Sequence, residues 1–399
     1  MKSNYRYIVK AFMAMAVIAG TTSCDDFLDR EPMSSISPET YYSTAAQLEA
    51  NLNDEYPNVL PSFGQWTYGI FGEDKGTDNQ IEVNANDRYT QDRWKVPHSE
   101  SDNWKFERIY RINFFLSEAL PKFGEDMSGS QNTISGSVAT IKHYIGEMYF
   151  LRAYEYFKKL QLFGDFPIID QPLADEMEAL REASKRFPRN EVARFIISDL
   201  DKAYAYMSDV DMATTRINKD AAMLVKSRVA LFEATWLQNF KGTAFVPGGE
   251  GWPGASLHNN YQYPSGNLDN EVKYFLEQAV EASKLVADKY KGNLTENTGV
   301  LQQSADDPSN PYFDMFAQED LSDVKEVLLW RQYARGLSTH NINAAAGRGN
   351  YRIGLTRGFV QNFLMKDGTP VYAHGSYADG DGYYMGDKTV ADVRVRSEE

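Results

Sequence analysis

The residue types that most often carry catalysis are present in this 399-residue chain, but not at catalytic spacings. Its five histidines include no pair at i and i+4 and no other usual metal-ligand spacing, which excludes a metal-hydrolase helix at the motif level. They are His98, His143, His258, His340 and His374. No G-x-S-x-G nucleophile elbow occurs, and 56 acidic residues are too many to single out one catalytic pair. These patterns favour a binding protein over an enzyme.

One short motif has the chemistry of a cation site. Residues 379–382 (DGDG) alternate carboxylates with glycines, and carboxylate and carbonyl oxygens suit the hard Ca²⁺ ion. The other ligands usual in a calcium loop are missing, so a plain turn is the favoured interpretation. We therefore expect no cofactor, with structural calcium at this motif as the alternative.

Charge and cysteine content exclude two further classes. The chain has 41 Lys and Arg against 56 Asp and Glu, a formal net charge of −15. Such an acidic chain repels phosphate backbones, so we expect no nucleic-acid partner. A single cysteine excludes an intramolecular disulfide framework and any zinc site with several cysteines.

That cysteine, Cys24, follows a segment with the order of a secretion signal. Lys2, Arg6 and Lys10 precede an apolar run at residues 11–20, which is too short to span a bilayer, and small residues follow. We expect residues 1–23 to be removed as a signal peptide and Cys24 to be the lipid attachment site of a bacterial lipoprotein. A free thiol is the alternative. Cleavage removes three basic residues and no acidic one, so the net charge becomes −18.

Apolar residues recur with a helical period from about residue 37 to residue 240 and again at residues 272–290, which predicts a mainly α fold. Residues 141–163 are apolar on nearly every side, so this helix should be central. Short polar turns between such helices indicate a helical-repeat or an antiparallel-bundle scaffold. No strict 34-residue period occurs, so the sequence is compatible with tetratricopeptide-like helical pairs only in a degenerate form.

Three features stand out against this helical pattern. Residues 241–268 contain six Gly, three Pro and four aromatic residues but only two charged ones, which predicts a long ordered loop. Residues 324–333 indicate a buried strand or a short helix, and the strand is the favoured interpretation. Arg152 lies on the otherwise apolar central helix and needs a partner, and we expect Glu147 or Glu155 to supply it.

Three stretches, taken together, resemble the SusD/RagB family of surface lipoproteins from Bacteroidetes. The first is residues 23–32 (SCDDFLDREP), which is similar to the family's lipidated N-terminus. The second joins residues 146–154 (GEMYFLRAY) to residues 162–167 (LFGDFP), like the family's central helix and its exit. The third joins PRN at 188–190 and IISDL at 196–200 to RINKDAA at 216–222. The resemblance covers residues 23–222.

This resemblance implies a SusD-like helical scaffold with a loop-rich region and minor β structure, forming a single domain over residues 24–399. Family members usually continue well past the equivalents of Asp367 and Gly368. They also have an RDPR-like stretch where this chain has DVRVR at residues 392–396. We therefore expect the C-terminal part of the domain to be truncated.

The resemblance also implies a non-enzymatic lipoprotein of the outer membrane, exposed at the cell surface. Such a protein captures oligo- or polysaccharide and delivers it to a TonB-dependent, SusC-like transporter. The alternatives are a peptide-capturing RagB-like lid, a tetratricopeptide-like protein-interaction scaffold without a small ligand, and an unrecognised surface hydrolase.

The proposed ligand site combines aromatic and planar polar side chains. A sugar stacks its C–H face on a Trp or Tyr ring, while Asp, Asn or Arg side chains fix its hydroxyls. The early acidic segment and the aromatic loop supply such groups, and in the family the region after the first helices contributes to the glycan site. The predicted ligand-binding residues are Asp78, Asn79, Arg93, Trp94, Trp252 and Tyr263.

Overall fold

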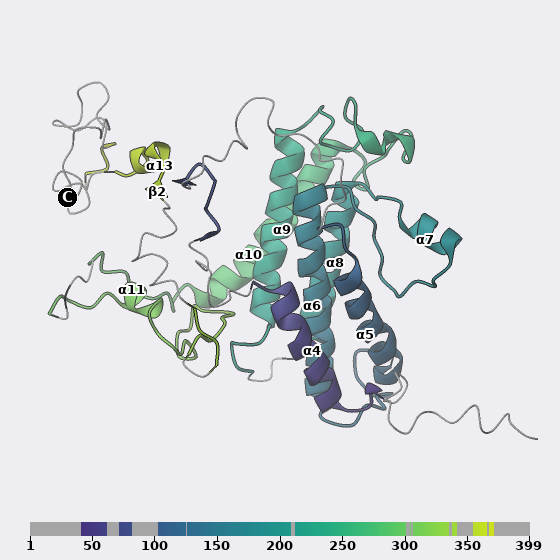
Figure 1. Cartoon of the computed structure of the whole chain (residues 1–399), viewed down its shortest axis with the longest axis horizontal. Helices are drawn as coiled ribbons and strands as arrows, with labels where there is room; N and C mark the ends of the chain where they lie inside the picture. The colour runs from purple at the N-terminus through teal and green to yellow at the C-terminus, as the bar shows by residue number, and fades with distance from the viewer. Residues whose placement is uncertain are drawn as a thin grey trace, which may run out of the picture. The chain divides into compact units, whose positions relative to one another are not determined.

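The computed structural model describes residues 41–61, 72–81, 103–124, 126–208, 212–300, 304, 306–334, 337–340, 354–364 and 367–370. These residues are mainly helical with very little strand, which confirms the predicted fold class (Figure 1). The chain divides into two compact units, and each is described by itself. The first comprises Met1–Tyr56, Glu107–Asp211 and Asn218–Val286, and the second Pro57–Phe106, Met212–Ile217 and Ala287–Glu399.

Long helices form the first unit. In chain order they are α4 (Ala45–Val59), α5 (Glu107–Phe123), α6 (Val138–Phe163), the short α7 (Met177–Ala183), α8 (Arg189–Tyr206), α9 (Lys219–Asn239) and α10 (Leu268–Tyr290). The last turns of α4 and α10 fall in the second unit. The loop between α9 and α10 contains one 3₁₀ turn, η3 (Pro253–Ser256), so the predicted loop is confirmed.

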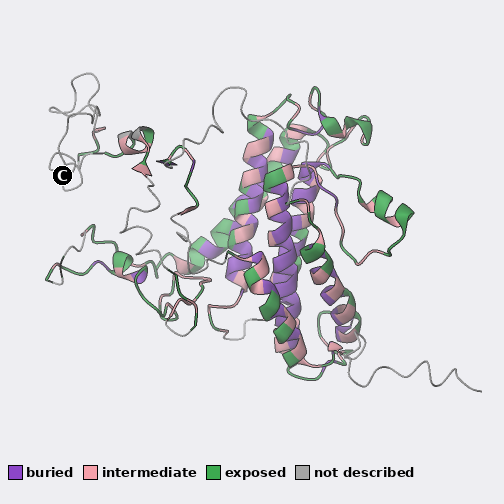
Figure 2. Cartoon of the chain, in the orientation of Figure 1, coloured by how far each residue is buried: buried purple, intermediate pink, exposed green. Residues whose placement is uncertain are grey.

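Helix α6 lies at the centre of this unit. It packs against α5 and α8, and α8 packs in turn against α9. Figure 2 shows α6 buried along most of its length, and residues on all of its sides are shielded from solvent. A helix that is apolar all round has no solvent-facing side, so the sequence prediction of a central helix is confirmed.

Two glycines let α6 fit its surroundings. At Gly146, an added Cβ would lie 2.8 Å from the backbone nitrogen of Met207 and 2.9 Å from the carbonyl oxygen of Ala203, so only glycine lets α6 approach the end of α8 this closely. Gly164 ends the helix with a φ of 68°, and its N–H bonds to the carbonyl of Leu160. Glycine adopts this conformation without steric cost.

Arg152 has a different partner from the one we expected. Its Nε lies 2.6 Å from Asp199 Oδ2 and its second terminal nitrogen 2.8 Å from Asp199 Oδ1, across the interface between α6 and α8. The remaining nitrogen donates to Asn113 Oδ1 and to the carbonyl of Asp170, both at 2.9 Å. The prediction of a local pair with Glu147 or Glu155 is therefore wrong.

A bidentate carboxylate from a neighbouring helix satisfies a guanidinium better than a single contact along the same helix. Burial disfavours the charged form of Arg152, but hydrogen bonds and charge from Asp199 outweigh it and raise the pKa of the guanidinium. The arginine therefore stays charged in the core and joins α5, α6, α8 and the chain that leaves α6.

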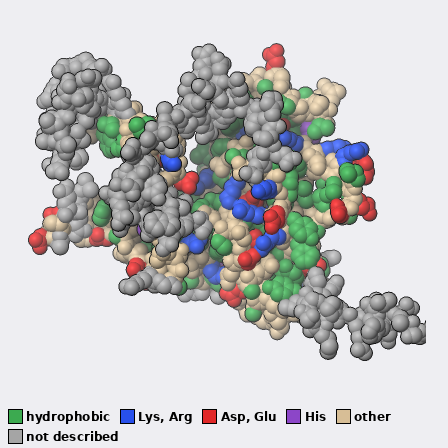
Figure 3. Space-filling model, in the orientation of Figure 1, with side chains coloured by type: hydrophobic (Ala, Val, Ile, Leu, Met, Phe, Trp, Pro, Cys, Tyr) green, Lys and Arg blue, Asp and Glu red, His purple; other side chains and the backbone are tan. Residues whose placement is uncertain are grey.

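The surface of the molecule interleaves both signs of charge. Figure 3 shows Lys and Arg side chains gathered beside Asp and Glu over the helices. Within the first unit, Arg108, Lys158 and Lys159 converge on the buried Glu155, with N–O distances of 3.8, 3.6 and 3.3 Å. The negative net charge is thus not spread evenly, because local basic groups surround individual carboxylates.

The second unit is less regular. It contains β1 (Gln80–Ile81) paired antiparallel with β2 (Gly354–Leu355), and the short helices α11 (Pro311–Met315) and α13 (Arg357–Gln361). Residues 324–333 form one turn and otherwise irregular chain, neither the strand we favoured nor the short helix, so that prediction is wrong. Their apolar residues pack without a sheet partner. The indole N–H of Trp330 donates to Thr214 Oγ1 at 2.8 Å, and the backbone N–H of Trp330 donates to the carbonyl of Thr214 at 3.1 Å.

No helix among the described residues is both long enough and apolar enough to cross a membrane.

We predict that Arg152→Met will lower the free energy of unfolding by about 3–5 kcal/mol, because it leaves the Asp199 carboxylate buried without its cation. Chemical denaturation followed by circular dichroism measures this. The control is Arg181→Met on α7, whose side chain is 68% exposed and should change stability by less than about 0.5 kcal/mol. Equal effects of the two substitutions would contradict the prediction.

Candidate functional site

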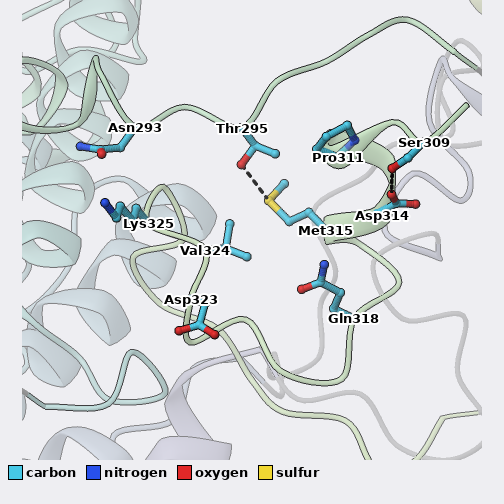
Figure 4. A pocket seen from close by; sticks show the side chains of 10 residues that line it. All are labelled: Asn293, Thr295, Ser309, Pro311, Asp314, Met315, Gln318, Asp323, Val324 and Lys325. Carbon is cyan, nitrogen blue, oxygen red and sulfur yellow. Dashed lines mark hydrogen bonds between the residues drawn. The ribbon is translucent and has the colours of Figure 1, made fainter.

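A surface pocket in the second unit has a volume of about 410 Å³, within the range of about 300–1,000 Å³ typical of small-molecule sites. Polar side chains supply most of its lining, and a smaller apolar group completes it (Figure 4). The lining residues are Asn293, Thr295, Ser309, Pro311, Asp314, Met315, Gln318, Asp323, Val324 and Lys325.

Helix α11 holds the apolar part of the pocket in place. Its first residue is Pro311, a position where the missing N–H costs no hydrogen bond. Met315 at its end is 7% exposed, and the hydroxyl of Thr295 lies 3.9 Å from its sulfur. Ser309 donates to Asp314 Oδ2 at 2.6 Å. The pocket thus has a floor of packed carbon and sulfur atoms.

Asn310, just before α11, fixes the loop that forms one side of the pocket. It is 5% exposed, and its side-chain nitrogen donates to Asn297 Oδ1 and to the carbonyl of Val300, both at 3.0 Å. A backbone bond of 3.0 Å runs from the N–H of Tyr312 to the carbonyl of Glu296. The loop is therefore attached to α11 at several points.

Four polar side chains of the lining remain free for a ligand. Within the described residues, Asn293, Gln318, Asp323 and Lys325 make no side-chain hydrogen bond or ion pair. Amides donate and accept, a carboxylate accepts, and an ammonium group donates. Together with the apolar floor, these groups suit a ligand that has many hydroxyls and some C–H surface.

A second polar cluster lies in the first unit and anchors the loop between α9 and α10. Glu271 at the start of α10 is fully buried and accepts from Arg194 Nε at 2.7 Å and from Asn190 Nδ2 at 3.0 Å. Its other oxygen accepts the backbone N–H of Ser265 at 3.1 Å. Burial alone raises the pKa of Glu271, but the bonds from Arg194, Asn190 and Ser265 outweigh it and lower the pKa.

Asp165 anchors the same loop from the end of α6. One oxygen accepts the backbone N–H of Arg189 at 2.9 Å, and the other accepts the indole N–H of Trp252 at 2.7 Å. Burial raises the pKa of Asp165, while these two hydrogen bonds act in the opposite direction. Arg189 in turn forms a buried pair with Glu233, with an N–O distance of 2.9 Å. The cluster is therefore structural.

Comparison with known proteins identifies the family. Residues 26–231, more than half of the chain, match the profile of the SusD-like proteins, described as starch-binding and associating with the outer membrane. The chain belongs to this SusD-like family. The resemblance found in the sequence is thereby confirmed.

Known SusD-like relatives match only part of their own length. The SusD-like proteins P2 and P25 of Formosa agariphila are each 25% identical to this chain. The match to P2 covers 60% of this chain and 46% of P2. The match to P25 covers 54% of this chain and 41% of P25. The chain therefore spans about half the length of the curated relatives it matches.

A solved structure agrees with the SusD-like fold. The crystal structure of a SusD-like carbohydrate-binding protein from Bacteroides fragilis aligns with a TM-score of 0.52 and 15% identity. The alignment covers 85% of this chain and 57% of that protein. At this identity the likeness shows the fold alone, and it agrees with the predicted SusD-like scaffold.

Two predicted site residues of this SusD-like chain, Asp78 and Asn79, lie beside β1 in the second unit. Asp78 is exposed, and its carbonyl accepts a hydrogen bond from the hydroxyl of Thr356. The carbonyl of Asn79 accepts the N–H of Thr356 at 2.9 Å. The backbone carbonyls of Asp78 and Asn79 therefore stabilise the short β pairing. The carboxylate of Asp78 accepts no hydrogen bond from the described residues.

The other two described residues, Trp252 and Tyr263, lie in the first unit. Trp252 is only 5% exposed, its ring stacks at 5.9 Å on His258, and Tyr261 lies 5.6 Å away. A ring that stacks on a sugar must be exposed, whereas the Trp252 ring is buried and its indole N–H is bound to Asp165. Tyr263 is half-buried and donates to the carbonyl of Pro247 at 2.5 Å. A glycan contact at either ring stays a prediction.

Three remaining predictions lie outside the described residues: the ligand contacts of Arg93 and Trp94, the lipid attachment at Cys24, and the calcium motif at 379–382. In the part of the chain that the structure describes, no cluster of three or more His, Cys, Asp or Glu side chains could hold a metal ion.

The predicted site was built around aromatic rings and did not include the pocket residues Asn293, Gln318, Asp323 and Lys325. The sequence does contain a pattern that indicates a polar binding site in this segment. Asn and Gln side chains surround a short Pro-initiated helix in an otherwise irregular segment, and such amides are free to bind a ligand.

We predict that Glu271→Gln will lower stability by about 2–3 kcal/mol at pH 7, since hydrogen bonds to a charged group are lost. A carboxylate whose pKa is lowered by folding stabilises the fold above its unfolded pKa, about 4.3 for Glu, and this stabilisation disappears as the pH falls. The difference between the variant and the wild type should therefore shrink below about pH 4.

Thermal denaturation at several pH values measures that difference. Glu277→Gln on the same helix is the control, because the Glu277 side chain is 65% exposed and its loss should cost less than about 0.5 kcal/mol. A difference between wild type and Glu271→Gln that stays constant from pH 7 to about pH 3 would contradict the lowered pKa.

Proposed function

We propose that this SusD-like chain captures oligo- or polysaccharide at the cell surface and delivers it to a TonB-dependent, SusC-like transporter. The observation that carries the glycan part is the pocket of the second unit, where Asn293, Gln318, Asp323 and Lys325 surround an apolar floor. Family membership supports the same ligand class, since the family is described as starch-binding and associated with the outer membrane.

The pocket is open and its free groups are exposed, as expected for a protein that passes its ligand on. A sugar hydroxyl both donates and accepts, so amide and carboxylate groups can pair with it without a specific charge. Each such bond contributes little, because water competes for it. The resulting affinity is moderate, which is compatible with capture followed by release to a transporter.

We also propose that the chain binds its ligand without catalysis, in place of the hydrolase alternative. A serine, a histidine and a carboxylate do meet in the first unit: Ser208 Oγ lies 3.4 Å from His143 Nδ1, and His143 Nε2 lies 3.1 Å from Glu147 Oε1. However, His143 is 1% exposed, Glu147 is fully buried, and Tyr56 donates to Glu147 at 2.5 Å. These groups are part of the helical core and leave no room for a substrate.

A RagB-like peptide-capturing lid is the second candidate, because amides and carboxylates also pair with peptide backbones. The two ligands are separated by screening the purified full-length chain against a glycan array and a peptide library. Glycan binding supports the proposal, whereas binding of peptides alone overturns it.

We predict that the double substitution Asn293→Ala and Gln318→Ala will weaken glycan binding at least tenfold, because two hydrogen bonds of about 1 kcal/mol each are lost. Isothermal titration with the best glycan of the array measures the affinity. Gln161→Ala, which removes an exposed amide on α6, is the matched control and should leave the affinity unchanged. Equal affinities of the double variant and wild type would show that the glycan binds elsewhere.

The aromatic site predicted from the sequence has its own test. We predict that Trp94→Ala will weaken glycan binding by about 1–3 kcal/mol if the ring stacks on a sugar as it would on a nucleobase. Titration with the same glycan measures this. Asp78→Ala tests the hydrogen-bonding partner in the same segment, and unchanged affinity in both variants would contradict this part of the site.

Lipid attachment at Cys24 is part of the same proposal. In cells fed an alkyne-bearing fatty acid, the wild-type chain should be labelled and sediment with the membranes, whereas Cys24→Ala should lose both properties because no other cysteine exists. Labelling that persists in Cys24→Ala would contradict the assignment.

A further inference from the structure

The pocket of the second unit lies in the most acidic stretch of the chain. Residues 292–330 contain eight carboxylates and a single basic side chain, Lys325. Two of these carboxylates, Asp314 and Asp323, line the pocket itself. A third, Glu326, accepts the backbone N–H of Thr295 at 3.1 Å and so lies behind the lining. The ligand therefore enters a region of negative potential.

The polar groups of the lining favour the same kind of ligand. A carboxylate only accepts hydrogen bonds, and an amide both donates and accepts, so Asp323, Asn293 and Gln318 are well matched to sugar hydroxyls. A sugar that carries its own carboxylate or sulfate would place acceptor against acceptor and like charge against like charge. Only Lys325 could compensate, and it is one cation among several carboxylates.

From this arrangement we propose that the pocket selects uncharged, hydroxyl-rich glycans and rejects uronic and sulfated ones. The inference rests on the proposed function and narrows its substrate class. The selection works by repulsion of the wrong ligand as well as attraction of the right one. Two like unit charges about 4 Å apart in water repel each other by roughly 1 kcal/mol. Two carboxylates together therefore reduce the affinity for an anionic sugar about tenfold or more.

The experiment compares matched pairs of ligands on the purified full-length chain. Linear α-1,4 and β-1,3 glucan oligosaccharides and β-1,4 galactan oligosaccharides are titrated beside the same chains oxidised at C6 to uronates. The expected result is at least about tenfold weaker binding of each uronate at low salt. This difference in affinity between neutral glycan and uronate should narrow at about 0.5 M salt, where exposed charges are screened.

Two variants separate the pocket from the net charge of the protein. Asp323→Lys also weakens neutral binding, because Asp323 accepts from sugar hydroxyls, so the affinity ratio of neutral glycan to uronate is what is compared. This ratio should fall to less than about threefold. Asp306→Lys changes the net charge equally at an exposed residue that does not line the pocket, and it should leave most of this ratio in place. An equal effect of the two variants would overturn selection by the pocket.

The remaining outcomes are distinct. Equal or tighter binding of uronates overturns the inference but leaves the proposed glycan capture intact. Binding of neither form, across all glycans tested, overturns the proposed function itself. Tighter binding of the neutral form that is lost in the Asn293 and Gln318 double variant supports both.

Discussion

A guanidinium that is removed from water must find several acceptors at once, and in the first unit this requirement fixes the helices around α6. Arg152 is 3% exposed, and its donors reach Asp199 on α8, Asn113 on α5 and the backbone of Asp170 after α6. Apolar contacts alone would allow these helices to slide along one another. The directional bonds of Arg152 select one register, a role that buried polar groups have in some other proteins.

Buried hydrogen bonds to charged side chains also hold the loop between α9 and α10. The loop of residues 241–267 has little secondary structure of its own, so its backbone and rings need external partners. Asp165 receives the indole of Trp252, and Glu271 receives Arg194, Asn190 and the backbone of Ser265. Trp252 thus holds the loop at the end of α6, Tyr261 holds it at Asn190 of α8, and the backbone of Ser265 holds it at the start of α10.

The pocket of the second unit has the opposite character. Its floor is held by Met315 and by the bonds of Asn310. Four side chains of the lining, those of Asn293, Gln318, Asp323 and Lys325, have no partners among the described residues. Polar groups that folding does not use are available to a ligand. This contrast between satisfied buried groups and unsatisfied exposed ones distinguishes the candidate site from the clusters that stabilise the fold.

By itself the sequence determined the mainly helical fold, the central position of residues 141–163 and the family, because helical periodicity and short motifs are local properties. Local properties also placed Gly164 and Asp165 at the end of α6. Only the tertiary structure decided which carboxylate pairs with Arg152 and that Trp252 turns inward. It also brought residues 293–325 together around a pocket. Each of these outcomes depends on which distant groups are satisfied when water is excluded, and spacing along the chain does not encode that choice.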